Sequence, residues 1–463
     1  MANEGKQNYT PALAVLTSLF FMWGLITSLN SVLVPYLKNV FTLNDFTSNL
    51  INSAFFIAFL IISVPAGALV KKTGYKLGCI IGLIVCALSA GLFVLCGSTQ
   101  SFPLFMVATF AIAIGVTILQ VAANPFVTVL GAPEGAAGRL NMTQGLNSLG
   151  TYVAPLIGSA FILKGIDTMQ VADKVKMVQT PYIVLGIVLI VLAIVFAIFK
   201  LPDPMKENTS GSGASEPEET AFEKLHSSAW AYRHVILGVL GIFTYVGAEV
   251  AVGSNIIGYL SSKLNIDAAS AAPYAALYWG AAMVGRFFAA LMFSKGGSSG
   301  KKMGYAALVA VVAFVIAYIA LKDPKMAAIY FGIAIANYIC FQIGAGNDKR
   351  TLGIFAIIAA VLAISPMIVS GHISMWTLCS IGLFNSMMFP TIFSLGIAKM
   401  GKKTPAASAA LCVGIVGGGV IPPVWGLVST NVGSAAAFAV CAVCYAYIAF
   451  FAFVGSKPEE VKA

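Results

Sequence analysis

Apolar stretches about as long as a membrane-spanning helix follow one another along almost the whole chain, separated by short polar turns. Because an α-helix rises about 1.5 Å per residue, roughly 20 apolar residues cross the hydrocarbon core of a bilayer. The pattern therefore predicts an all-α polytopic membrane protein with about 14 hydrophobic segments. The predicted spans are 10–37, 44–70, 75–97, 102–130, 139–163, 180–200, 232–260, 269–294, 303–321, 326–344, 351–371, 373–399, 405–430 and 434–455.

The basic residues are distributed unevenly over the turns between these spans. If the N-terminus is cytoplasmic, the cytoplasmic segments hold 19 of the 27 Lys and Arg residues, the outer turns hold 7, and Arg286 lies within a span. Cytoplasmic loops of membrane proteins carry such an excess of positive charge. The sequence therefore predicts an even number of spans, both termini in the cytoplasm, and insertion into the cytoplasmic (inner) membrane.

Composition supports a membrane protein and disfavours several other classes. Hydrophobic residues make up 59% of the chain and charged residues 10%, whereas a soluble protein has about 25% charged residues. The net charge of +10 comes from basic residues at span ends, so no nucleic-acid partner is expected. The 8 cysteines form no motif with histidine, so neither a metal site nor a cofactor is expected. No nucleophile–base pair or soluble signalling domain is recognisable, which disfavours an enzyme or a sensor.

One long polar segment divides the chain into two groups of spans. Residues 201–231 are rich in Gly, Ser, Pro and Glu, which is typical of a flexible linker. The segment predicts an N-terminal six-helix half at 1–200, a cytoplasmic linker, and a C-terminal half at 232–463. Two bundles joined in this way are typical of transporters built from repeated halves. A two-bundle channel or a membrane enzyme would show the same division.

Ionisable side chains within a bilayer are costly and mark functional positions. Glu249 lies in the middle of a predicted span, where it could exchange a proton, bind a cation, or serve as a structural carboxyl paired with Arg286. Arg286 lies nearer the cytoplasmic end of its own span and could form a gate or a structural ion pair. Lys71 and Lys72, in the turn after the second span, and Arg139, before the fifth, are further gate or structural candidates.

Neutral polar side chains form a larger set within the predicted spans. Asn141, Gln144 and Asn147 are three residues apart, which places them near one face of a helix. Side-chain amides both donate and accept hydrogen bonds, so they suit an uncharged ligand rich in hydroxyl groups. The alternative is hydrogen bonding between helices. The candidate substrate-binding residues are Asn30, Ser31, Gln120, Asn124, Asn141, Gln144, Asn147, Asn255 and Asn385.

Prolines and glycines interrupt several spans. Pro65, Pro125 and Pro390 lie within predicted helices, and the stretch "GGGVIPP" occupies 417–423. Such residues are tolerated in membrane helices where neighbouring groups satisfy the freed backbone, and they mark bends in transporters. We therefore expect these spans to be bent near a functional site.

Several of these segments together are similar to those of one family. The strings "SLFFMWGLITSLNSVLVPYLK", "AANPFVTVLG", "RLNMTQGLNSLG" and "GLFNSMMFPTIFSLGI" resemble sugar symporters of the major facilitator superfamily, in the fucose/glucose–galactose group. The resemblance implies two six-helix halves, a central sugar site, alternating access, and uptake driven by a Na+ or H+ gradient. It also implies that the partners are a small-molecule sugar and the lipid bilayer, and that the protein is a monomer.

Two positions depart from the fucose-type pattern of that family. Fucose–proton members carry Asp where this chain has Ser31 and Glu where it has Gln120, so the usual proton-coupling carboxyls are missing. Gln120 and the string "YVGAEV" resemble the glucose/galactose branch instead. The resemblance therefore favours a hexose bound by Gln144 and Asn147, with Glu249 as the coupling residue. The alternatives are an uncoupled sugar facilitator and a symporter for fucose or N-acetylglucosamine.

The segment 303–350 has no counterpart in a plan of twelve spans. It contains two apolar stretches separated by "LKDPKM". Because an even number of added spans keeps the following spans correctly oriented, we predict an extra helical hairpin. The alternative is that one member of 303–371 is not a true span. Asn337, Gln342 and Asp348 are expected to stabilise the hairpin and its loops and not to bind substrate.

Overall fold

The computed structural model describes the helical bundle and most of its turns. The described residues are 9–42, 45–131, 135–158, 161–162, 173, 176–199, 201, 228–265, 268–293 and 298–458. The predicted linker therefore lies almost wholly outside the described part of the chain.

Long helices make up both predicted halves. Those of the N-terminal half are α1 (Thr10–Val40), α2 (Asp45–Thr73), α3 (Tyr75–Thr99), α4 (Phe102–Val129), α5 (Ala136–Gly158) and α7 (Gln179–Ile198). Those of the C-terminal half are α10 (Arg233–Leu264), α11 (Ala268–Phe293), α12 (Ser299–Leu321), α13 (Pro324–Gly344), α14 (Asp348–Ile364), α15 (Gly371–Asn385), α16 (Met388–Gly396), α17 (Thr404–Val413), α18 (Gly417–Asn431) and α19 (Ser434–Phe450). Short helical turns are η4 (Ala229–Ala231), η5 (Ser365–Met367), η6 (Gly401–Lys403), η7 (Gly414–Val416) and η8 (Phe451–Gly455).

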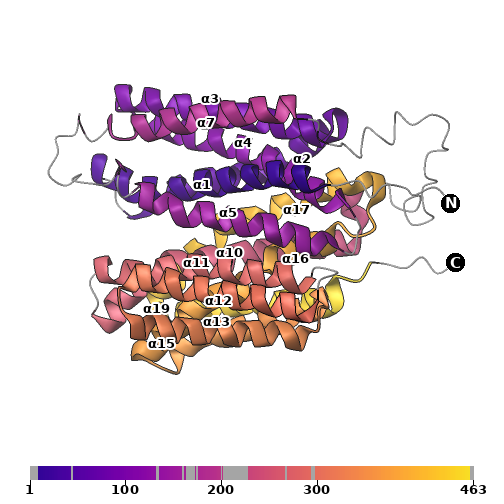
Figure 1. Cartoon of the computed structure of the whole chain (residues 1–463). Helices are drawn as coiled ribbons and strands as arrows, with labels where there is room; N and C mark the ends of the chain where they lie inside the picture. Colours follow the sequence, from indigo (N-terminus) through magenta and orange to yellow (C-terminus); the bar gives the residue numbers. More distant parts are fainter. Residues whose placement is uncertain are drawn as a thin grey trace, which may run out of the picture.

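Thirteen helical segments among the described residues are long and apolar enough to cross a membrane. Helix α5 is not among them, although it runs with the others through the bundle (Figure 1). It carries the polar residues Asn141, Gln144 and Asn147. Its neighbours α1 and α11 cover it on two sides, so the bundle accommodates a helix that is too polar to face lipid all round.

The helices form two bundles that lie side by side with their axes roughly parallel (Figure 1). Within the N-terminal bundle α1 packs on α5, and α3 packs on α4 and α7. Within the C-terminal bundle α10 packs on α18 and α19, and α14 packs on α19. The halves meet along two seams, α5 with α11 and α2 with α17. Helix α1 begins and η8 ends at the same end of the molecule, here called the terminal face (right in Figure 1).

The predicted hairpin is present. Helices α12 and α13 pack against each other and against α11, on the side of the C-terminal bundle away from the N-terminal half (Figure 1). Both helices are long and apolar enough to be spans, as is the segment Asp348–Met367 that follows. All three segments therefore have the length and composition of a span, and whether each of them crosses the membrane stays a prediction.

A proline inside α4 frees a backbone carbonyl that joins the two halves. Pro125 has no N–H to donate to the carbonyl of Val121, four residues earlier. The hydroxyl of Ser408, on α17 of the other half, donates to this carbonyl at 3.2 Å. Nearby, a Cβ on Gly67 of α2 would lie 2.5 Å from the Cβ of Ala409, so this glycine lets α2 approach α17.

Replacing Ser408 by alanine should weaken this seam through the orphaned Val121 carbonyl. An unsatisfied buried acceptor costs about 1–3 kcal/mol. In a Pro125→Ala background the backbone N–H of residue 125 can supply the missing donor. Ser408→Ala should therefore lower the stability of the fold by less in that background. A double-mutant cycle on thermal unfolding in detergent measures this difference. Equal costs in the two backgrounds would contradict the assignment.

Candidate functional site

The break between α15 and α16 lies deep in the C-terminal bundle and exposes backbone groups to side chains. Asn385 ends α15, and Ser386 and Met387 separate it from α16. Pro390 leaves the carbonyl of Ser386 without its usual backbone donor. The Nε of Arg286, on α11, donates to that carbonyl at 3.0 Å. The predicted bend at Pro390 is therefore a helix break stabilised by a buried guanidinium.

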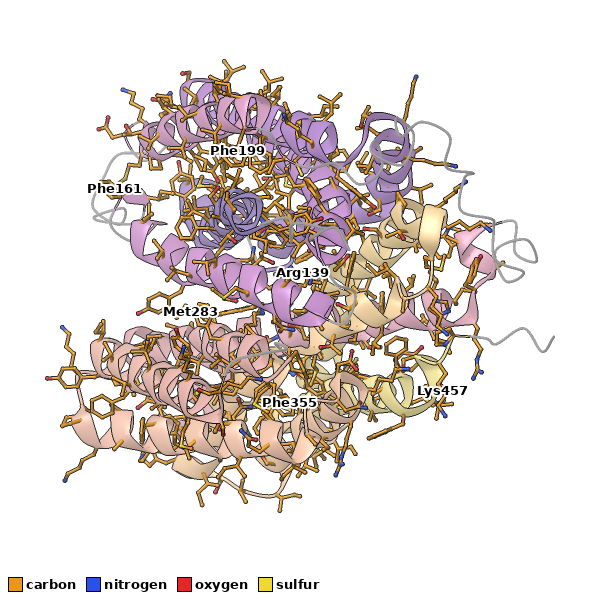
Figure 2. All side chains as sticks on the ribbon, turned by 45° about the vertical axis from the view of Figure 1, so that its right-hand side comes forward. Arg139, Phe161, Phe199, Met283, Phe355 and Lys457 are labelled. Carbon is orange, nitrogen blue, oxygen red and sulfur yellow. The ribbon has the colours of Figure 1, made fainter. Side chains whose placement is uncertain are left out.

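Arg286 also reaches across to the other half. Its Nη1 donates to the carbonyl of Gln144 at 3.3 Å and to the hydroxyl of Ser148, both on α5. The side chain is 7% exposed, so it does not extend to the surface at the terminal face. One charged group thus holds α5, α11 and the α15–α16 break together at the boundary of the two bundles, where Met283 also lies (Figure 2).

Glu249 lies in a cluster of tyrosines beside this link. Its Oε1 accepts a hydrogen bond from the hydroxyl of Tyr245, one helical turn earlier, at 2.6 Å. The hydroxyl of Tyr278 donates to the backbone carbonyl of Glu249 at 2.9 Å and accepts from Nδ2 of Asn385 at 2.8 Å. The hydroxyl of Tyr445, on α19, is buried close to Glu249 and has no hydrogen-bond partner among the described residues. Within the described chain Glu249 forms no ion pair, and its side chain is half-buried.

Arg286 acts on this carboxyl through space. The electrostatic interaction between Arg286 and Glu249 is attractive, and Arg286 also interacts with Tyr245. No ion pair joins the two side chains among the described residues. The sequence suggested Arg286 as a structural partner of Glu249, and this pairing stays a prediction.

Two predicted carboxamides of the N-terminal half are joined directly. Nε2 of Gln144 donates to Oδ1 of Asn124 at 3.2 Å, and both side chains are buried. Nδ2 of Asn124, Oε1 of Gln120 and Oδ1 of Asn30 are buried without a hydrogen-bond partner among the described residues. Buried polar atoms normally have partners. These atoms offer one donor and two acceptors to a polar ligand.

The other predicted carboxamides have partners within the protein. Nδ2 of Asn147 donates to the carbonyl of Phe20 on α1 at 3.0 Å. Asn141 and Asn255 donate to carbonyls four residues earlier on their own helices, each at 2.8 Å. Asn147 thus contributes to the packing of α1 on α5 through one of its two polar atoms. The roles of these three residues in substrate binding stay predictions.

The remaining predicted residues lie near the terminal face, except Ser31, whose side chain is not described by the structure. Lys71 and Lys72 are exposed in the last turn of α2. Arg139 donates to the carbonyls of Val127 and Thr128 at 3.2 and 2.7 Å, so it caps the C-terminal end of α4. The backbone of Ser31 lies within α1, but its side chain lies outside the described residues, so its role stays a prediction.

Sequence reasoning missed the hydroxyl groups of the site. Tyr245, Tyr278, Ser148 and Ser386 are absent from the substrate-binding, coupling and gate residues predicted above. The signal for Tyr245 was its position four residues before the single deeply placed carboxyl, on the same helix face. The other three come from helices that are distant in sequence, and only the packed structure brings them together.

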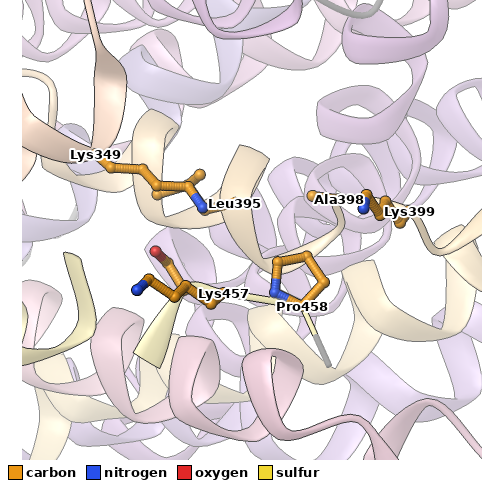
Figure 3. Close-up of a pocket in the computed structure, with 7 residues that line it drawn as sticks. Lys349, Leu395, Ala398, Lys399, Lys457 and Pro458 are labelled. Carbon is orange, nitrogen blue, oxygen red and sulfur yellow. The ribbon is translucent and has the colours of Figure 1, made fainter. Parts of the chain in front are cut away.

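Two further features of the molecule bear on a second site. No group of three or more His, Cys, Asp and Glu residues that could hold a metal ion exists among the described residues. A cavity of about 620 Å³ opens at the terminal face, lined by Lys349, Leu395, Ala398, Lys399, Ser456, Lys457 and Pro458 (Figure 3). Lysines are common where membrane helices meet water, so the cavity is assigned no ligand.

Two helical bundles that meet at a buried polar cluster, with interrupted helices in the C-terminal bundle, define a polytopic membrane transporter. The chain belongs to the Major Facilitator Superfamily, whose family description matches residues 15–348. Its fold is the major facilitator fold of two six-helix halves, with α12 and α13 added between the second and third helices of the C-terminal half.

Individual relatives are similar over nearly their whole length. The chain is 42% identical to the glucose/galactose transporter of Brucella abortus biovar 1 over 456 residues, covering 98% of this chain and 96% of that protein. It is 31% identical to the L-fucose-proton symporter of Escherichia coli, covering 96% and 93%. Among solved structures, FucP in the outward conformation matches with a TM-score of 0.73 and 30% identity, covering 96% of this chain and 98% of that one.

Proposed function

We propose that this protein carries a neutral hexose of the glucose/galactose type across the cytoplasmic membrane by proton-coupled symport. The observation that carries the proposal is a set of uncharged hydrogen-bonding groups in each half, one of them beside a carboxyl, with Arg286 linking the two halves. The carboxamide pair Gln144–Asn124 belongs to one half, and Asn385, Tyr278 and Glu249 to the other. Amides and phenols that both donate and accept suit the hydroxyl groups of a sugar.

The donor set around Glu249 favours a proton over a sodium ion. Hard cations take about six or more oxygen ligands. Glu249 is the one carboxyl in the described cluster, and its Oε1 is held by the phenol of Tyr245. A single carboxyl with a tyrosine donor can exchange a proton without further ligands. The 31% identical relative named as a proton symporter supports the same choice.

Arg286 connects this proton site to the movement of the halves. While Glu249 is ionised, it attracts the guanidinium that also holds Gln144 and Ser148 of α5. Protonation removes that attraction and changes the balance of the contacts across the boundary. A sugar bound between the same two halves would add contacts across the boundary in place of the lost attraction. The sugar and the proton would therefore stabilise the same arrangement of the two halves. Such a dependence is the requirement for symport, because a ligand shifts a conformational equilibrium only by its differential affinity.

The same proposal includes topology and assembly. The basic residues of the terminal face, among them Lys71, Lys72 and Lys403, support a cytoplasmic location for that face and for both termini. The proposed site is built from the helices of one chain, so a monomer is sufficient for transport. An uncoupled facilitator is the alternative, since Ser31 and Gln120 stand where fucose-type relatives carry acids.

Uptake of labelled glucose, galactose, fucose and N-acetylglucosamine into proteoliposomes tests the substrate. Glucose and galactose should be taken up with KM values lower than those of the other two sugars. Gln144→Leu removes the donor to Asn124 and should raise KM by at least about tenfold, since a site built to hydrogen-bond a hydroxyl loses affinity steeply when a partner is removed. Asn431→Leu, a matched change at the exposed end of α18, should leave KM unchanged. Uptake of none of the four sugars would overturn the proposal.

A further inference from the structure

The inserted hairpin contacts the broken helix at the point where it presents Asn385. Asn337 of α13 is fully buried, and its Nδ2 donates to the carbonyl of Leu383 at 3.3 Å. The same carbonyl accepts from the hydroxyl of Ser386 at 2.6 Å. Leu383 and Ser386 flank Asn385 in sequence, so a side chain of the hairpin is bonded within two residues of the proposed sugar ligand.

A row of phenylalanines makes a second connection from the hairpin to the same point. The ring of Phe341, on α13, lies 4.5 Å from that of Phe355, on α14, measured between centroids. Phe355 in turn lies 5.2 Å from Phe384, the residue before Asn385. All three rings are buried, and Phe355 lies inside the C-terminal bundle (Figure 2). Edge-to-face pairs of this kind fix the relative position of the helices that carry them.

The hairpin also reaches the helix that carries Tyr278. The hydroxyl of Tyr330, on α13, donates to the carbonyl of Leu277 at 3.2 Å. Leu277 immediately precedes Tyr278, whose hydroxyl accepts from Asn385. The hairpin therefore contacts the backbone beside both members of the Asn385–Tyr278 pair, but only the contact through Asn337 acts on the break itself.

We propose that hairpin α12–α13 is a support built into the transport site, and that Asn337 is a positioning residue that sets sugar preference through Asn385. A helix break is the part of a span whose backbone can shift, because its hydrogen-bond ladder is interrupted. Two side-chain donors, Asn337 and Ser386, converge on the Leu383 carbonyl and fix that backbone. The inference rests on the proposed function, since it assigns a preference among sugars.

The test compares KM for glucose with KM for galactose in Asn337→Leu, which keeps the branching of the side chain and removes the donor. The ratio of the two KM values should change by about three- to tenfold, the factor in affinity that one net hydrogen bond is worth. Gln342→Leu is the matched control: it removes another carboxamide of α13, whose Nε2 donates to Sδ of Met292 at 3.5 Å in an exposed position, and it should leave the ratio unchanged.

The remaining outcomes decide between a positioning role and a structural one. Ser386→Ala removes the second donor to the same carbonyl and should change the ratio too, which keeps the inference testable if Asn337→Leu does not fold. If both variants lower uptake of the two sugars equally, the hairpin only stabilises the fold and the inference is overturned. If the unaltered protein takes up neither sugar, it is the proposed function that fails.

Discussion

Replacing Glu249 by glutamine is expected to abolish uphill accumulation of sugar while sugar-for-sugar exchange continues. Glutamine has the shape of a protonated glutamate, and its amide oxygen can still accept from the hydroxyl of Tyr245. It cannot release a proton, so the step in which an empty carrier returns after losing its proton is lost. Exchange needs no such step, because the carrier crosses loaded in both directions.

The size of the expected loss follows from the driving force. One charge crossing a potential of 100 mV supplies about 2.3 kcal/mol, which corresponds to roughly 50-fold accumulation. The Glu249→Gln variant should bring the sugar only to its external concentration. Thr244→Val is the matched control, because the Thr244 hydroxyl bonds carbonyls of its own helix beside Tyr245. Undiminished accumulation in Glu249→Gln would remove Glu249 from the coupling role.

Replacing Arg286 by alanine is expected to reduce exchange as well as accumulation, by more than about tenfold. The guanidinium binds the Ser386 carbonyl on its own half and the Gln144 carbonyl and Ser148 hydroxyl on the other. Hydrogen bonds to charged groups are worth about 1.5–3 kcal/mol each. Losing them should change the equilibrium constant between the arrangements of the two halves by a factor of ten or more. The substitution also removes the positive charge that attracts Glu249.

A lysine at this position should restore only part of the activity. Arg286→Lys keeps the charge that acts on Glu249, but a single ammonium cannot reproduce the fork that reaches two helices. Arg350→Ala, an exposed arginine in the first turn of α14, serves as the control and should retain normal exchange. If Arg286→Ala exchanges sugar at the rate of the unaltered protein, the bridge has no part in the movement of the halves.

Hydropathy predicted the apolar spans, because each span must satisfy its own backbone and cover itself with apolar side chains. The added hairpin also required the comparison with a plan of twelve spans. Hydropathy was sufficient to single out Glu249 and Arg286 as ionisable residues within spans. Their partners could not be predicted. Arg286 binds a carbonyl that Pro390 leaves free and a helix of the other half, and such contacts depend on how helices distant in sequence pack together.

The polar face predicted for α5 shows a second limit. Residues three apart on a helix differ by about 60° in direction, since a turn takes about 3.6 residues. Over two such steps the direction changes by about 120°, so the three side chains meet different parts of the protein. Asn141 bonds its own helix, Gln144 bonds Asn124 on α4, and Asn147 bonds the backbone of α1. Spacing grouped these residues, and only the neighbouring helices distinguish them.

The central claim is that a sugar and a proton enter together through the site around Glu249. The most direct measurement is the external pH of a lightly buffered suspension of proteoliposomes, free of sodium and without an imposed gradient, when galactose or glucose is added. The account predicts that the medium becomes more alkaline on addition of the sugar, and that Glu249→Gln shows no such change. Sugar uptake at an unchanged external pH in the unaltered protein would contradict it.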